Sequence, residues 1–112
     1  IDYNFEINSN ININENSLNL TQKISLYRII QESLLNIARH SKATYVNISG
    51  KETQNKHYIK IKDNGLGLKK NLKNSMGLQG IESRVNYLMG SFSIQNSKTG
   101  GVQLEIEFPK RA

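Results

Sequence analysis

The sequence predicts an α+β fold in which a mostly antiparallel sheet of about five strands carries two helices on one face. Two segments have apolar residues at the three- and four-residue spacing of an amphipathic helix. Five short segments are rich in β-branched and aromatic residues or alternate with period two, and clusters of glycine and polar residues separate them. With 112 residues, the chain is long enough for one hydrophobic core.

The N-terminal region predicts an edge strand. Tyr3, Phe5 and Ile7 alternate with polar residues, which is the pattern of a half-buried strand. Residues 11–19 are polar apart from three positions, so we expect a surface connection there rather than a domain boundary.

The clearest helix pattern follows Thr21, whose hydroxyl is predicted to cap the helix. Apolar residues recur at helical spacing as far as Ala38, namely Ile24, Tyr27, Ile30, Leu34 and Ile37. Three more residues widen this face, Leu26, Ile29 and Leu35, so we expect the helix to lie against the sheet. A polar stripe remains at four-residue spacing and comprises Arg28, Glu32, Asn36 and His40, with Arg39 beside the last turn.

The second half of the chain predicts a hairpin, a helix and two closing strands. Two β-rich runs, at 45–48 and 58–61, flank a polar segment, and the second run ends at Asp63. The sequence DNGLGL (63–68) follows, and after a polar loop MGLQGIESR (76–84) leads into a second helix that Gly90 is expected to cap. Residues 91–95 and 102–108 alternate as strands around a glycine turn.

Composition restricts the classes of function. Fifteen Lys and Arg residues against nine Asp and Glu residues give a net charge of +6 and a pI near 9.7, which favours an anionic partner. Within residues 51–73 the only acids are Glu52 and Asp63, and the basic residues are Lys51, Lys56, Lys60, Lys62, Lys69, Lys70 and Lys73. The lack of cysteine excludes thiol nucleophiles and cysteine-ligated zinc. No apolar run approaches the roughly 20 residues of a membrane span.

Several residues supply what a nucleotide site needs. Asp63, at a strand end, can accept a hydrogen bond from an exocyclic amine, and the missing side chains of Gly65 and Gly67 let the backbone pass close to a flat base. Asn36 offers a neutral oxygen suited to Mg²⁺. Glu32, one helical turn earlier, can hold a metal-bound water or orient the attacking group.

The second helix adds a phosphate site, because free backbone amides near Leu78 follow Gly77. Each feature also has a purely structural explanation. Glu32 and Asn36 can be solvated helix positions, DNG can be a tight turn, and the basic run can be a solvated surface. The structural explanations do not predict the order in which these features occur.

The sequence resembles the GHKL ATPases, in the form found in sensor histidine kinases of the NarL, DesK and LiaS type. LYRIIQESLLNIARHSKA (26–43) is similar to their N box, DNGLGL to the first glycine box and GLQGIESRVNYLMGSFSI (77–94) to the second. GGVQLEIEFP (100–109) resembles the closing strand, although Val102 stands where the family commonly has threonine. The resemblance covers about residues 20–109, and three ordered boxes at the right separations make it specific.

The resemblance implies a Bergerat-fold domain that binds ATP and Mg²⁺ through the residues that match the family's motifs. It assigns Asn36 as magnesium ligand and catalytic residue, Glu32 as the catalytic acid of the N box, and Asp63 as the carboxylate that reads adenine. The remaining nucleotide contacts that it implies are Arg39 and His40 near the phosphates, Gly65 and Gly67 in the first box, and Gly77, Leu78 and Gly80 in the second. Residues 68–76 would form a short lid over the nucleotide that carries Lys69, Lys70 and Lys73.

The resemblance also implies a biological setting. Residues 1–112 would be the catalytic and ATP-binding domain of a longer bacterial sensor, without the helical hairpin that carries the phosphoacceptor histidine. We therefore expect a homodimeric histidine kinase that signals to a response regulator, a cytoplasmic location for this domain, and no self-phosphorylation by the domain alone. Two alternatives remain, a stand-alone serine kinase of the anti-sigma type and a basic nucleic-acid-binding domain. The latter is weakened by the absence of tryptophan and of any recognised nucleic-acid reading motif.

Overall fold

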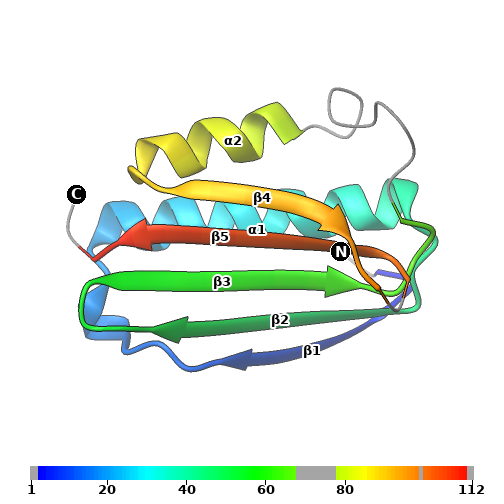
Figure 1. Cartoon of the computed structure of the whole chain (residues 1–112), viewed down its shortest axis with the longest axis horizontal. Coiled ribbons are helices and arrows are strands. Elements are labelled where there is room, and N and C mark those ends of the chain that lie inside the picture. The colour runs from blue at the N-terminus through cyan, green and yellow to red at the C-terminus, as the bar shows by residue number, and fades with distance from the viewer. Residues whose placement is uncertain (1–2, 68–77, 99, 111–112) are drawn as a thin grey trace.

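The computed structural model describes residues 3–67, 78–98 and 100–110, which form one sheet with both helices packed on the same face (Figure 1). The strands are β1 (Glu6–Ile11), β2 (Tyr45–Glu52), β3 (Lys56–Asp63), β4 (Ser91–Asn96) and β5 (Val102–Pro109). The helices are α1 (Leu20–His40) and α2 (Leu78–Tyr87), with a 3₁₀ turn, η1 (Glu15–Ser17), before α1. The sheet order is β1-β2-β3-β5-β4, and only the β1–β2 pairing is parallel among these five strands. The predicted α+β class and the order of the elements are confirmed.

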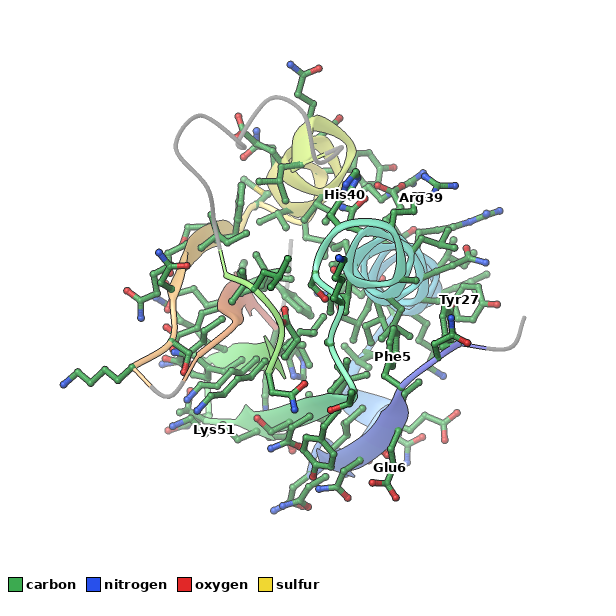
Figure 2. All side chains as sticks on the ribbon, turned by 90° about the vertical axis from the view of Figure 1, so that its right-hand side faces the viewer. Phe5, Glu6, Tyr27, Arg39, His40 and Lys51 are labelled. Atoms are coloured by element: carbon green, nitrogen blue, oxygen red, sulfur yellow. The ribbon has the colours of Figure 1, made fainter. Side chains whose placement is uncertain are left out.

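The N-terminal strand lies at the sheet edge, as predicted, but it begins at Glu6. Tyr3 and Phe5 precede it, stack on each other with ring centroids 5.0 Å apart and pack against the core. Figure 2 shows Phe5 below α1, beside the start of β1. All six side chains of β1 are exposed, so the half-buried alternation was wrong for the strand and holds only for the residues before it.

Helix α1 begins two residues earlier than the sequence suggested. Asn19, not Thr21, caps it: the Asn19 side chain accepts from the Gln22 amide at 2.8 Å, and the Gln22 side chain accepts from the Asn19 amide at 3.0 Å. The face toward the sheet is also rotated from the predicted one. Ile24 and Tyr27 are 53% and 65% exposed, and the buried residues are Gln22, Ser25, Leu26, Ile29, Ser33, Leu34 and Ile37.

Helix α2 buries Leu78, Ile81 and Val85, as its spacing predicts. The residue that ends the helix in the left-handed conformation is Met89, with φ of 60°, rather than Gly90. The Met89 amide donates to the Asn86 carbonyl and the Gly90 amide to the Val85 carbonyl, which is the Schellman pattern. Gly90 is needed for another reason, because a Cβ there would overlap the Glu107 carbonyl of β5.

The core lies between the helices and alternate residues of the central strands. Burial alternates strictly along β5, where Val102, Leu104, Ile106 and Phe108 face the helices. On the outer face, Lys56 pairs with Glu107 at 3.2 Å and Lys60 with Glu105 at 3.8 Å. Part of the basic run is therefore neutralised by β5, which weakens the expectation of a continuous basic surface. No helix among the described residues has the length and apolar character needed to cross a membrane.

Candidate nucleotide site

The predicted site residues gather at one end of the sheet, at the right of Figure 1, where α1 and β3 end and β5 begins. Asp63 is the last residue of β3 and is only 4% exposed. Its Oδ1 accepts hydrogen bonds from the Gly65 amide at 2.7 Å and the Val102 amide at 3.4 Å. Burial raises the pKa of Asp63 above its ordinary value, and these two amides only partly oppose that shift. Val102 has no hydroxyl, so it contacts Asp63 through its backbone amide.

The segment after Asp63 packs tightly on the end of α1. The Leu66 amide donates to the Ser41 carbonyl at 2.7 Å, and a Cβ at Gly65 would overlap that same carbonyl. The Asn64 side chain has a further role: its Oδ1 accepts from the Thr44 and Tyr45 amides at 2.9 and 3.0 Å and so anchors the α1–β2 connection. Among the residues of this segment, Gly67 has positive φ, at +85°, whereas Asn64 and Gly65 do not. The positive φ angles expected of a tight Asn-Gly turn are therefore absent, and the chain bends instead through the hydrogen bond from the Gly65 amide to Asp63 Oδ1.

A cavity of about 30 Å³ lies between α1, α2 and the ends of β3 and β5. It brings together three predicted site residues, Asn36, Asp63 and Leu78. The rest of the wall is mainly apolar and comprises Ser33, Ile37, Ser41, Ile61, Ile81, Ile94, Val102 and Leu104. An apolar wall with few fixed polar groups is typical of sites for flat aromatic ligands, but 30 Å³ is far below the roughly 300 Å³ of such sites, so a base would enter only after this wall opens.

Asn36 and Ser33 are the polar residues of α1 that line this cavity. The Ser33 hydroxyl donates to the Ile29 carbonyl, whereas the buried Nδ2 of Asn36 has no hydrogen-bond partner among the described residues. A rotation of the amide exchanges its nitrogen and oxygen, so the position offers either a donor or a neutral oxygen. The described residues contain no group of three acidic, histidine or cysteine side chains that could hold a metal by themselves. One neutral oxygen still fits Mg²⁺, which commonly takes few protein ligands and keeps its waters or phosphate oxygens.

Glu32 does not line the cavity. It lies between the two helices, where its Oε1 accepts from Arg84 Nε of α2 at 3.0 Å. Gly80, also on α2, is the other neighbour, because a Cβ there would stand 2.6 Å from Glu32 Oε2. The structure therefore brings Glu32 and Gly80 together. Glu32 lies one helical turn before Asn36 on α1, and neither Glu32 nor Gly80 lines the cavity that contains Asp63.

The basic pair Arg39 and His40 is exposed at the C-terminal end of α1. Figure 2 shows both on the side of α1 that faces α2. The other histidine, His57, lies at the opposite end of β3 and is fully buried, with its Nε2 3.3 Å from the Ser17 carbonyl. Neither histidine therefore shares the cavity with Asp63.

Some predicted positions lie outside the described residues, namely Gly77 and the lid segment with Lys69, Lys70 and Lys73. Other contacts were missed by the sequence reasoning. Gly101 has φ of +83°, and a Cβ there would overlap the Asp63 carbonyl. The Gly-Gly pair before the last strand was the available signal, but it was interpreted only as a turn. Arg84 gave a second signal, since it follows Gly80 by four residues and so shares its helix face.

A larger hollow of about 440 Å³ lies on the outer face of the sheet, with Lys51, Tyr58 and Lys60 among its lining residues. None of the predicted site residues lines it. Along β2 and β3, side chains that face this hollow alternate with side chains that face the core. Asp63 is on the core side, so the sheet lies between it and the hollow.

The chain is similar to known proteins in sequence and in fold. Residues 21–112 match the sequence model of the family described as histidine kinase-, DNA gyrase B- and HSP90-like ATPases. The chain is 43% identical over 95 residues to the sensor histidine kinase ComP of Bacillus subtilis, which covers 81% of this chain and 12% of ComP. It is 37% identical over 89 residues to the histidine-protein kinase/phosphatase DegS of Brevibacillus brevis, covering 78% of this chain and 23% of DegS.

Solved structures show the same fold. The ATP-binding domain of PrrB from Mycobacterium tuberculosis superposes with a TM-score of 0.70 at 24% identity, over 80% of this chain and 69% of that one. The histidine kinase AdeS of Acinetobacter baumannii superposes with a TM-score of 0.81 at 15% identity, over 97% of this chain and 56% of that one.

Proposed function

Because this chain belongs to the family of histidine kinase-, DNA gyrase B- and HSP90-like ATPases, we propose that residues 1–112 are the catalytic and ATP-binding domain of a two-component sensor histidine kinase. The chain spans only 12% and 23% of ComP and DegS, whose names describe kinases. In our proposal, the γ-phosphoryl group of ATP passes to a histidine on a dimerisation domain of the same longer, homodimeric protein, and then to a response regulator. ATP as the donor favours the cytoplasm as the location of this domain.

The alternative of a serine kinase of the anti-sigma type is not favoured, because the similar proteins are named as sensor histidine kinases. A nucleic-acid-binding function is not favoured either. Two lysines of the basic run are paired with glutamates of β5, and three of the predicted site residues, Asn36, Asp63 and Leu78, line an apolar cavity instead of a charged groove.

The observation that carries the proposal is a buried carboxylate on an apolar cavity. In the proposed complex, the cavity widens beyond its 30 Å³, Asp63 accepts a hydrogen bond from the adenine amino group, and apolar residues of the wall cover the faces of the base. Gly65 and Gly67 keep the adjoining backbone free of side chains. A buried acceptor that discriminates an amino group from a carbonyl oxygen gives preference for adenine over guanine.

The phosphates would be held at the α1–α2 side of the cavity. Asn36 would supply an oxygen to Mg²⁺, and Glu32 would accept a hydrogen bond from a hydrating water. When bound, Mg²⁺ neutralises charge on the phosphate oxygens during transfer. Arg39, exposed at the end of α1, would add positive charge near the phosphates, and the adjacent His40 ring would donate a hydrogen bond to them. The backbone amides of Leu78 and Gly80 at the start of α2 would donate hydrogen bonds to the phosphates, a role that the resemblance also implies for Gly77.

Calorimetry with ATP and GTP tests the proposal. Replacing Asp63 with Ala removes the acceptor and should weaken ATP binding by about 1 to 3 kcal/mol, with less effect on GTP. Glu6→Ala is a matched control, because it removes an exposed carboxylate from β1 at the sheet edge. No measurable ATP binding by the unmodified chain would refute the proposal. Unchanged affinity and base preference in Asp63→Ala would remove Asp63 from the site.

A further inference from the structure

The Glu32 carboxylate is bound to α2 through one oxygen, and its other oxygen lies beside Gly80 of the same helix. Arg84 Nε donates to Glu32 Oε1 at 3.0 Å. Glu32 Oε2 is so close to Gly80 that a Cβ added there would stand 2.6 Å from it. Gly80 and Arg84 are four residues apart, so they lie on the same face of α2, toward α1. The missing side chain of Gly80 makes room for the carboxylate, and the guanidinium of Arg84 fixes its direction.

This ion pair differs from the two on the outer face of the sheet, Lys56–Glu107 and Lys60–Glu105. Those pairs join exposed side chains of neighbouring strands, and pairs of that kind contribute little to stability. The side chains of Glu32 and Arg84 are still 30% and 40% exposed, so stability alone is a weak reason for the contact. Its distinguishing property is its place, one helical turn from Asn36 on the same side of α1.

We propose that Arg84 is a positioning residue, which holds the Glu32 carboxylate in the orientation that receives a water of the Mg²⁺–nucleotide complex. The inference rests on the proposed function. A free glutamate side chain samples several rotamers and would have to be ordered when the ligand binds. Arg84 orders it beforehand, as partners of metal-site residues commonly do. Arg84 itself acts through Glu32, so its contribution should appear only when Mg²⁺ is present.

The test measures the ATP dissociation constant of the chain by calorimetry, once with Mg²⁺ and once with EDTA. The ratio of the two constants is the magnesium enhancement. Glu32→Gln and Arg84→Ala should each lower this ratio by about three- to ten-fold. That is below the 10- to 100-fold loss typical of partners that orient metal ligands, because this pair is partly exposed and screened by salt. The double variant should lose no more than the larger single loss.

Three controls separate positioning from other roles. Arg84→Lys keeps the positive charge and should recover at least half of the lost enhancement on a logarithmic scale. Lys56→Ala breaks an ion pair of similar length and exposure far from the site and should leave the ratio unchanged. Urea unfolding of each variant shows whether the domain still folds, and Arg84→Gln replaces Arg84→Ala if the latter unfolds.

The outcomes are distinct. Equal losses with Mg²⁺ and with EDTA would show that Arg84 contacts the nucleotide or only packs, and additive losses in the double variant would show that it acts independently of Glu32; either result overturns the inference. An unmodified chain that does not bind ATP would refute the proposed function itself. If the unmodified chain binds ATP with a magnesium enhancement and Arg84→Ala has the same enhancement, only the positioning role of Arg84 is refuted.

Discussion

Replacing Gly101 with Ala should destabilise the protein more than the same replacement at the adjacent Gly100. Both residues have left-handed backbone conformations, with φ of +102° at Gly100 and +83° at Gly101. Their surroundings differ completely. A Cβ at Gly100 would meet nothing within 4 Å, whereas a Cβ at Gly101 would overlap the Asp63 carbonyl and stand 2.8 Å from Asp63 Oδ1. The pair therefore separates backbone strain from steric overlap.

The expected magnitudes follow from these two terms. A left-handed alanine costs about 1 to 2 kcal/mol, and this is the whole expected loss for Gly100→Ala. An added carbon in a filled site costs typically about 1 to 3 kcal/mol more, so Gly101→Ala should lose about 2 to 5 kcal/mol of unfolding free energy. To relieve the overlap, β5 must move away from β3 at Asp63. The contact from the Val102 amide to Asp63, already 3.4 Å long, would then be lost.

Urea unfolding and ATP calorimetry on both variants check this reasoning. Gly101→Ala should be the less stable variant and should also bind ATP more weakly, because Asp63 loses an amide that fixes its carboxylate. Gly100→Ala should bind ATP as the unmodified chain does. Equal losses of stability in the two variants would show that the close approach of β5 to Asp63 has no energetic consequence. Normal ATP affinity in Gly101→Ala would show that this approach does not position the carboxylate.

Two further predictions concern the polar residues of the cavity. Asn36→Ala should weaken ATP binding by roughly ten-fold with Mg²⁺ and much less in EDTA, as measured by calorimetry, because only the metal complex uses the amide oxygen. Asp63→Asn should raise the unfolding free energy at pH 7 while weakening ATP binding. Burial raises the pKa of Asp63 in the folded chain, so the folded state loses stability as pH rises from the unfolded value of 3.8 through the raised one. The advantage of Asp63→Asn in urea unfolding should therefore grow over that pH interval and vanish below it.

Local patterns predicted the elements of the fold well, because each element depends on nearby residues. The strands around Ile59 and Leu104 alternate clearly, and their burial follows that alternation. The pattern of α1 was less decisive. Its apolar residues surround much of the helix, so the sequence could not show that Ile24 and Tyr27 face away from the sheet. Figure 2 shows Tyr27 on the outer flank of α1. The rotation is decided by which residues meet the strands, and that is a tertiary property.

The site was predictable in its residue types but not in its contacts. Motif spacing placed Asn36 and Asp63 in one site, and both line the same cavity. The ion pair between Glu32 and Arg84 joins residues 52 positions apart, and the approach of Gly101 to Asp63 joins two non-neighbouring segments. Such pairs depend on how α2 and β5 dock, so no local pattern contains them. The roles of these residues toward a nucleotide stay predictions that the proposed binding experiments test.

Buried polar groups of the domain differ in how completely they are satisfied. Gln22, at the other end of the core, bonds to Asn19 through its oxygen and to the Pro109 and Lys110 carbonyls through its nitrogen. His57 has an unbonded Nδ1, but the Glu52 carboxylate lies 3.6 Å from it. His57 therefore has an unpartnered atom although its contacts are those of a residue that packs within the fold. An unpartnered polar atom by itself is accordingly weak support for a ligand site.

Two residues that line the apolar cavity, Asp63 and Asn36, each lower the stability of the folded chain. Asp63 is a buried carboxylate whose pKa is raised by desolvation, and Asn36 holds a buried amide nitrogen without a partner among the described residues. An unsatisfied buried amide costs about 1 to 3 kcal/mol, and the two amide donors of Asp63 only partly offset the burial of its carboxylate, so packing does not account for keeping both residues in the same cavity. A ligand with an amino donor and anionic oxygens would satisfy both groups at once. Stability and binding should therefore respond in opposite directions at Asp63, where an uncharged amide relieves the folded chain but weakens the acceptor that the nucleotide would use.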